Sequence, residues 1–107
     1  MVAFFVMEKK RPTYHLEAIQ AALGTVNALA MTSSALRDAL ALGFDRQGVV
    51  ETIASIRPSM FYKSMTTVLD HRVWQDVYHV PAKGYILYVK FQADVITQFT
   101  VMSFKEK

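Results

Sequence analysis

Hydrophobic residues recur at three- and four-residue intervals in the first half of the chain and at two-residue intervals in the second half. The first spacing is typical of helices that bury one face, and the second is typical of half-buried strands. Helices collected before an antiparallel meander indicate an α+β domain, with the helices packed on one face of a small sheet. At 107 residues the chain, residues 1–107, is expected to form one domain with a single core.

About three helices are expected, each beginning at a residue whose side chain can cap it. The first is predicted over residues 14–23, and Gly24 is a typical stop. An extended piece over residues 28–31 separates it from the second helix, which ends at Gly43. Pro58 closes the third, because a proline disfavours helix in the residue before it. The capping residues are Thr13, Thr32 or Ser33, and Asp45, and the core positions are Leu16, Ile19, Leu23, Leu36, Ala39, Leu40, Val49, Ile53 and Ile56.

Residues 85–95 alternate strictly and predict a strand that follows a turn at Lys83 and Gly84. One face is apolar and should lie on the core, and the other carries a polar stripe on which a ligand could sit. The apolar face comprises Tyr85, Leu87, Val89, Phe91, Ala93 and Val95, and the opposite face Ile86, Tyr88, Lys90, Gln92 and Asp94. Residues 74–80 and 99–105 are the expected neighbouring strands.

Composition narrows the possible functions only modestly. The formal net charge of +3 is a mild bias toward polyanions. Without any cysteine the chain has neither disulfides nor a thiolate metal site. Residues 1–7 are apolar but too short to span a bilayer, and the basic residues follow them, contrary to a secretion signal. We therefore expect a cytoplasmic protein with no membrane partner.

Chemically useful side chains concentrate in residues 61–78. Lys63 could neutralise charge that develops on a phosphate, and Gln75, on an otherwise apolar strand face, could hold a substrate oxygen. Tyr88 lies in the polar stripe, where a phenol can transfer a proton or stack on a base. Each also has an ordinary structural interpretation, as a solvated lysine, an amide bonded to the backbone and a half-buried aromatic residue.

A second interpretation uses the histidines. His71 and His79, with Lys63, could cut RNA by general acid–base catalysis, provided that the two rings converge. Tyr62 and Trp74 could stack on bases, although most aromatic residues at this density should be core. The histidines and carboxylates follow no recognisable metal-binding spacing, so neither a metal site nor a cofactor is expected.

Nearly the whole chain, from Met7 to Lys107, resembles the MqsR (motility quorum-sensing regulator) family of toxins. The resemblance is carried by FYKSMTT (61–67), DHRVWQDVY (70–78) and SFKEK (103–107), with weaker similarity in 7–16 and 34–44. It implies a RelE-like fold and a type II toxin–antitoxin toxin that acts as an mRNA endoribonuclease, which causes growth arrest. Residues 1–6 precede the usual start of the family, which leaves Met1 and Met7 as alternative natural starts.

The resemblance also assigns roles to particular residues. The family's catalytic lysine falls on Lys63, its glutamine on Gln75 and its tyrosine on Tyr88. The implied reaction is metal-independent cleavage of single-stranded mRNA at GC-containing triplets, by attack of the ribose 2′-hydroxyl on the adjacent phosphorus. The remaining substrate-binding candidates are Tyr62, Arg72, Trp74, His79 and Lys90.

The implied partner is an antitoxin with a zinc-binding part and a helix-turn-helix part, through which any DNA contact would be made. Two departures from the family bear on RNA binding: the region 31–37 keeps only Arg37, and His79 stands where an arginine is common. They leave open an alternative function, that of a catalytically inactive binding module that pairs with its antitoxin only to adjust repression.

Overall fold

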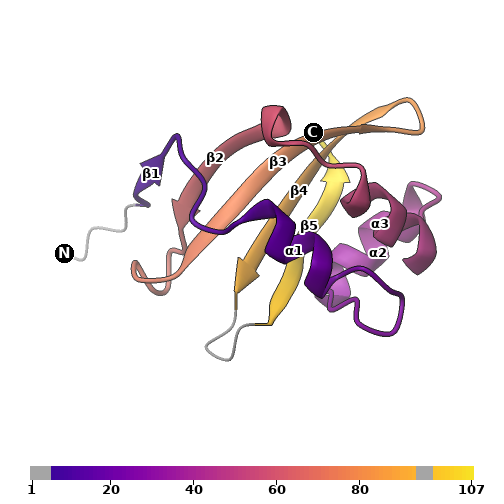
Figure 1. The fold of residues 1–107 in the computed structure, drawn as a ribbon, viewed down its shortest axis with the longest axis horizontal. Helices are drawn as coiled ribbons and strands as arrows, with labels where there is room; N and C mark the ends of the chain where they lie inside the picture. The colour runs from indigo at the N-terminus through magenta and orange to yellow at the C-terminus, as the bar shows by residue number, and fades with distance from the viewer. Residues whose placement is uncertain (1–5, 94–97) are drawn as a thin grey trace.

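The computed structural model describes residues 6–93 and 98–107. In this part of the chain, a five-stranded antiparallel sheet has its strands side by side in chain order (Figure 1). The strands are β1 (Glu8–Lys9), β2 (Phe61–Thr66), β3 (Trp74–Ala82), β4 (Tyr85–Ala93) and β5 (Phe99–Glu106). The helices are α1 (Leu16–Ala22), α2 (Ser33–Ala41), α3 (Arg46–Ala54) and the short 3₁₀ helix η1 (Pro58–Met60). The predicted α+β class is confirmed, and its likeness to the RelE fold stays a prediction.

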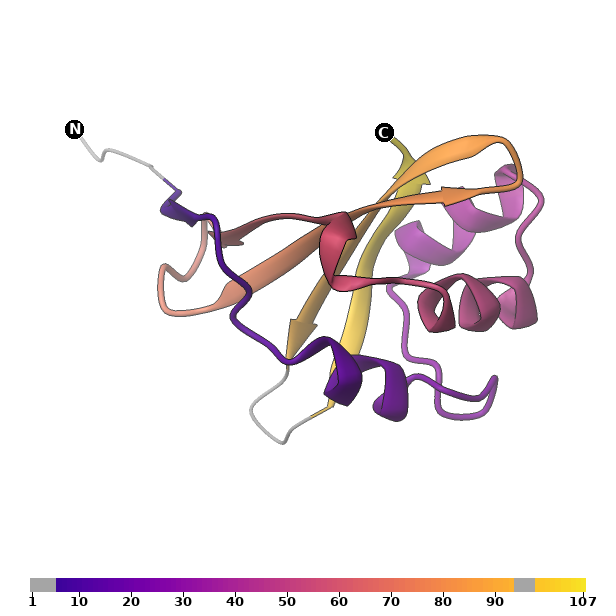
Figure 2. The ribbon, with the colours of Figure 1, turned by 45° about the horizontal axis from the view of Figure 1, so that its top comes forward.

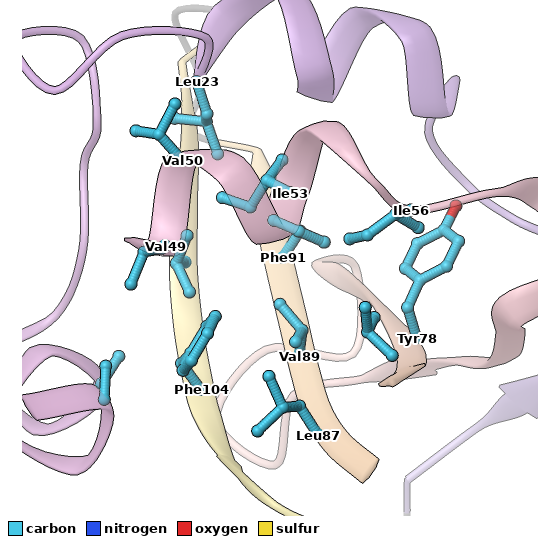
Figure 3. Close-up of a cluster of buried hydrophobic side chains, with 14 of the residues drawn as sticks. Leu23, Val49, Val50, Ile53, Ile56, Tyr78, Leu87, Val89, Phe91 and Phe104 are labelled. Carbon is cyan, nitrogen blue, oxygen red and sulfur yellow. The ribbon is translucent and has the colours of Figure 1, made fainter. Parts of the chain in front are cut away.

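The helices cover one face of the sheet, and the core lies between the two layers (Figure 2). Val49 and Ile53 of α3 lie over the sheet residues Leu87, Val89 and Phe91 (Figure 3). These three alternate residues of β4 are fully buried, as the period-two pattern predicts. Asp94 of the predicted polar stripe and Val95 of the predicted apolar face lie outside the described residues, as does nearly all of the predicted extension 1–6.

The predicted start of the first helix and one predicted core position of the second helix are wrong. Helix α1 begins at Leu16 rather than Tyr14, and the Thr13 hydroxyl pairs with Ser64 Oγ at 2.8 Å instead of capping the helix. Leu40 was expected in the core but is 54% exposed, because α2 turns its small residues Ala35 and Ala39 inward. Small side chains allow α2 to lie close to β5.

The other predicted helix signals are confirmed. The Thr32 hydroxyl accepts from Ala35 N–H and caps α2, and the Asp45 carboxylate accepts from Gly48 N–H at 2.7 Å and caps α3. The extended piece predicted over residues 28–31 is present only at its end, where Met31 forms an isolated parallel bridge with Val101 of β5, whereas Ala28 belongs to a turn. Helix α3 ends four residues before Pro58, which begins η1.

Strand β2 was not predicted from the hydrophobic pattern. Its two fully buried positions facing the helix layer are Ser64 and Thr66, so the usual apolar alternation is missing. The buried hydroxyls have partners: Ser64 pairs with Thr13, and Thr66 Oγ1 accepts from Met7 N–H at 2.9 Å. At these two positions hydrogen bonds therefore hold the strand in place, as apolar packing does elsewhere in the sheet.

Asp76 of β3 joins the segment before α1 to the sheet. Its side chain is fully buried, and its two oxygens accept from the backbone N–H groups of Thr13 and Tyr14 at 2.9–3.1 Å. Tyr14 adds a hydrogen bond from its hydroxyl to the Trp74 carbonyl at 2.7 Å. Because hydrogen bonds to a charged acceptor are stronger than neutral ones, this carboxylate is a main attachment of the N-terminal segment.

Replacing Asp76→Ala should lower the free energy of unfolding by about 3 kcal/mol, since it removes charge-assisted hydrogen bonds and leaves backbone donors unpaired. Urea unfolding followed by circular dichroism measures the loss. The matched control is Asp45→Ala, which removes the α3 cap and should cost about 1 kcal/mol. Equal losses in both variants would contradict the role given to Asp76.

Candidate functional site

The sheet face turned away from the helices carries most of the predicted site residues. Strand register places its side chains in three rows that cross the sheet, and we call this surface the open face. The first row runs Met65, Gln75, Gln92 and Thr100; the second Lys63, Val77, Lys90 and Ser103; the third Tyr62, His79, Tyr88 and Lys105.

A β-bulge in β2 decides which side chains reach the open face. Phe61 pairs with Tyr78 and Lys63 pairs with Val77, so Tyr62 is an extra residue in the strand. Phe61 therefore packs toward the core against Tyr78, with ring centroids 5.6 Å apart. Tyr62 stacks on His79 of the open face, next to Lys63, so two consecutive residues reach one face. Re-aiming a side chain in this way is a common use of bulges beside functional sites.

Lys63 is held by an ion pair at the edge of the sheet. Its ammonium lies 2.5 Å from a carboxylate oxygen of Glu8 in β1, and its side chain is only 17% exposed. The hydrogen bond that Lys63 donates to the Glu8 carboxylate is the main cause that raises the pKa of Lys63, and the same bond lowers the pKa of Glu8. Lys63 is thus a fixed positive charge that lies mostly out of water.

The third row is a chain of aromatic contacts. The rings of Tyr62 and His79 stack with centroids 4.1 Å apart, and His79 lies 6.2 Å from the ring of Tyr88. Cations contact the outer rings: the Lys10 ammonium is 4.9 Å from the Tyr62 centroid, and the Lys105 ammonium is 5.5 Å from that of Tyr88. Aromatic faces with nearby cations suit nucleobases and phosphates.

Burial shapes the protonation of this face. It raises the pKa of the Tyr88 phenol, an effect that Lys63 partly opposes, so the hydroxyl keeps its proton. Burial lowers the pKa of Lys90, and the nearby Lys105 lowers it further. His79 likewise has a lowered pKa, first through burial and then through Lys107, which favours the neutral imidazole.

Gln75 lies on the open face beside Val77, as predicted, but its amide is already engaged. Its Nε2 donates to Oε1 of Gln92 across the strands at 2.8 Å, and the residue is 7% exposed. Gln75 lies in the first row, and Lys63 and Tyr88 lie in the second and third. The structure therefore places the three predicted catalytic residues on the open face, with Lys63 and Tyr88 in adjacent rows and Gln75 in the row on the other side of Lys63.

Two substrate-binding candidates lie elsewhere. Arg72 is in the β2–β3 loop, where its guanidinium pairs with Asp70 at 3.1 Å. Trp74 belongs by alternation to the face of Asp76 and Tyr78, and the Lys9 ammonium lies 4.2 Å from its ring. His71 is exposed in the same loop as Arg72, so it does not converge with His79.

Three residues of the site were not singled out from the sequence: Glu8, Lys10 and Lys105. Glu8 and Lys63 are 55 residues apart in the chain, and no local spacing signals their contact. Lys105 could have been found, because it continues the alternation of the last strand and pairs with Tyr88. Among the described residues, no three His, Cys, Asp or Glu side chains gather as metal ligands.

Comparison with known proteins identifies the class of this domain. The family described as "Motility quorum-sensing regulator, toxin of MqsA" matches residues 11–106, and the chain belongs to this toxin family. The chain is 40% identical over 101 residues to the mRNA interferase toxin MqsR of Escherichia coli (strain K12). This alignment covers 94% of the chain and 100% of that relative. No helix in the described ranges is long and apolar enough to cross a membrane.

Removing the carboxylate of Glu8 should make Lys63 a weaker base. In Glu8→Gln the pKa of Lys63 is expected to fall, because the charged hydrogen-bond acceptor is lost while the burial that opposes the ammonium remains. A titration of lysine side chains by NMR measures this shift. Glu17→Gln, an exposed change in the first turn of α1, should leave Lys63 unchanged; an equal shift in both variants would contradict the assignment.

Proposed function

We propose that this protein is the toxin of a type II toxin–antitoxin system and cleaves single-stranded mRNA as a metal-independent endoribonuclease. The MqsR relative is named an mRNA interferase toxin, and its full length aligns with this chain. The observation that carries the proposal is the open face itself. There a fixed lysine, a protonated tyrosine and a stack of aromatic rings occupy adjacent rows.

Lys63 would stabilise the charge that develops on phosphorus when the ribose 2′-hydroxyl attacks. Its ammonium is preorganised by Glu8 and mostly removed from water, a setting in which an electrostatic contribution to the transition state is large. A phosphate oxygen would bind the Lys63 ammonium, either in place of the Glu8 carboxylate or together with it. The products would be a 2′,3′-cyclic phosphate and a 5′-hydroxyl.

The open face also fits an extended, single-stranded substrate. Sequence-dependent recognition of RNA commonly uses unstacked bases on aromatic side chains of a sheet, and Tyr62 is 40% exposed beside His79. Lys90 in the second row and Lys105 at the end of the third row would contact the phosphates. Gln75 would position a substrate oxygen through the amide it now shares with Gln92. The proposal includes a preference for GC-containing triplets, and only the resemblance to the family supports this part of it.

The proposed partner is the cognate antitoxin, because the matched family is described as toxin of MqsA. We expect an antitoxin with a zinc-binding part and a helix-turn-helix part, so that DNA is contacted only through it. The site of action would be the cytoplasm, where mRNA is translated.

Lys63→Ala and Tyr88→Phe should each reduce RNA cleavage about 100- to 1000-fold while the fold is retained, since each removes one group that stabilises or protonates the transition state. The assay follows a short single-stranded RNA in EDTA and maps the new ends. Arg57→Ala is the charge-matched control, because Arg57 is exposed before η1 on another part of the molecule.

Full activity in both site variants would reject these residues as the catalytic groups. Wild-type protein that binds its antitoxin tightly but cleaves no RNA would instead support the inactive binding module. Mapping RNA ends after brief expression in cells would show the cleaved sequence and test the triplet preference.

A further inference from the structure

Lys10 lies beside Tyr62 at the edge of the open face. Its ammonium is 4.9 Å from the centre of the Tyr62 ring, and the Lys63 ammonium is 5.4 Å from the same centre. The two ammoniums are therefore no more than about 10 Å apart, which brings both within contact of consecutive phosphates of an extended single strand. Lys10 is exposed, so an incoming strand reaches it directly.

The edge strand β1 directs two neighbouring lysines to opposite sides of the sheet. Side chains alternate along an extended segment, so Glu8 and Lys10 share one side and Lys9 takes the other. The contacts agree with this alternation. Glu8 pairs with Lys63 on the open face, whereas the Lys9 ammonium lies 4.2 Å from the ring of Trp74 on the helix side of the sheet. Two adjacent residues thus carry the same charge, but only Lys10 faces the proposed RNA path.

The charge of Lys10 is not neutralised by its neighbours. The Glu8 carboxylate accepts the hydrogen bond of Lys63, the main cause of its lowered pKa, and Lys10 adds only a weaker electrostatic effect. Within residues 6–93 and 98–107, Lys10 forms no ion pair. Glu8 and Lys63 together are neutral, so Lys10 supplies the excess positive charge at this edge of the open face. A polyanion is attracted to such an uncompensated ammonium.

Resting on the proposed function, we infer that Lys10 is a further substrate-binding residue, which holds the phosphodiester next to the scissile one. Lys63 binds the scissile phosphate, Lys10 binds its neighbour, and the nucleotide between them lies across the Tyr62 ring. The second contact sets the direction in which the RNA backbone leaves the site. Lys10 touches no reacting atom, so it contributes binding of the strand rather than stabilisation of the transition state.

The test uses a short single-stranded RNA that the protein cleaves, with the 2′-hydroxyl at the mapped cut replaced by hydrogen so that the RNA stays intact. Binding is measured over a range of salt concentrations for wild type, Lys10→Gln, Lys10→Arg and the matched control Lys9→Gln. Lys10→Gln should bind about 3- to 10-fold more weakly. The slope of log affinity against log salt should become shallower by about 0.7, the share of one phosphate in a single strand. Lys10→Arg and Lys9→Gln should keep the wild-type slope.

Cleavage kinetics separate binding from chemistry. With the unmodified RNA, Lys10→Gln should raise KM by the same factor by which it weakens binding, and it should leave kcat unchanged, because the contact is equally strong in the ground state and the transition state.

A scan of the RNA backbone locates the contact. Each phosphate in turn is replaced by a neutral methylphosphonate, and affinity is compared between wild type and Lys10→Gln. Wild type should lose affinity at the scissile phosphate and at a direct neighbour. At that neighbour the loss should vanish in Lys10→Gln, because the variant has already lost the charge that this phosphate contacts.

Three results would overturn the inference. Equal losses in Lys10→Gln and Lys9→Gln would show only a general dependence on positive charge. A neighbour whose loss persists in Lys10→Gln would assign that phosphate to another group. A wild-type scan in which neither neighbour of the scissile phosphate matters would reject the contact without any variant. Cleavage that continues in these cases leaves the proposed function intact, whereas wild-type protein that cleaves no RNA rejects the proposed function and this inference with it.

Discussion

The buried carboxylate of Asp76 sets which way strand β3 faces. It must point into the helix layer, because its partners are the backbone N–H groups of Thr13 and Tyr14. Side chains alternate along a strand, so Gln75 and Val77 are then directed to the opposite face. A shift of one residue would turn Gln75 toward the helices and the Asp76 carboxylate away from them, which would leave the backbone N–H groups of Thr13 and Tyr14 unpaired. The polar contact on the inside therefore determines the composition of the surface outside.

The bulge in β2 and the edge strand β1 supply further groups of the open face. The bulge places Tyr62 and Lys63 on one face, and β1 brings Glu8 against the lysine. The resulting arrangement combines groups that are fixed by neighbours and partly removed from water. In such surroundings an ammonium or a phenol acts on a bound phosphate without first reorganising, which is the condition for strong electrostatic catalysis.

Local patterns predicted much of the architecture. Residues Thr32 and Asp45 cap helices as expected, and β4 alternates as its sequence indicates, because these features depend on neighbouring residues only. Strand β2 was missed since its inward positions are Ser64 and Thr66, whose partners lie 51 and 59 residues away. Thr13 was misread as a cap for the same reason.

The site residues show the same difference between what neighbouring residues indicate and what only the folded chain shows. Lys63, Gln75 and Tyr88 came from family resemblance, and only the register of β2, β3 and β4 shows that they share a surface. Arg72 and Trp74 are close to Gln75 in sequence, yet a loop and the alternation of β3 direct them elsewhere. Glu8 carries no local signal at all.

The two-residue strand β1 has consequences for the order in which the molecule assembles. Strands β2 to β5 follow one another in the chain and can pair through short connections, whereas β1 must return across 55 residues to reach Lys63. Closing so long a loop for so few backbone bonds is entropically costly, which makes β1 the last strand to dock and the first to open. The carboxylate over Lys63 is thereby attached to the least cooperative part of the sheet. It can be exchanged for an incoming anion while the remaining four strands stay folded.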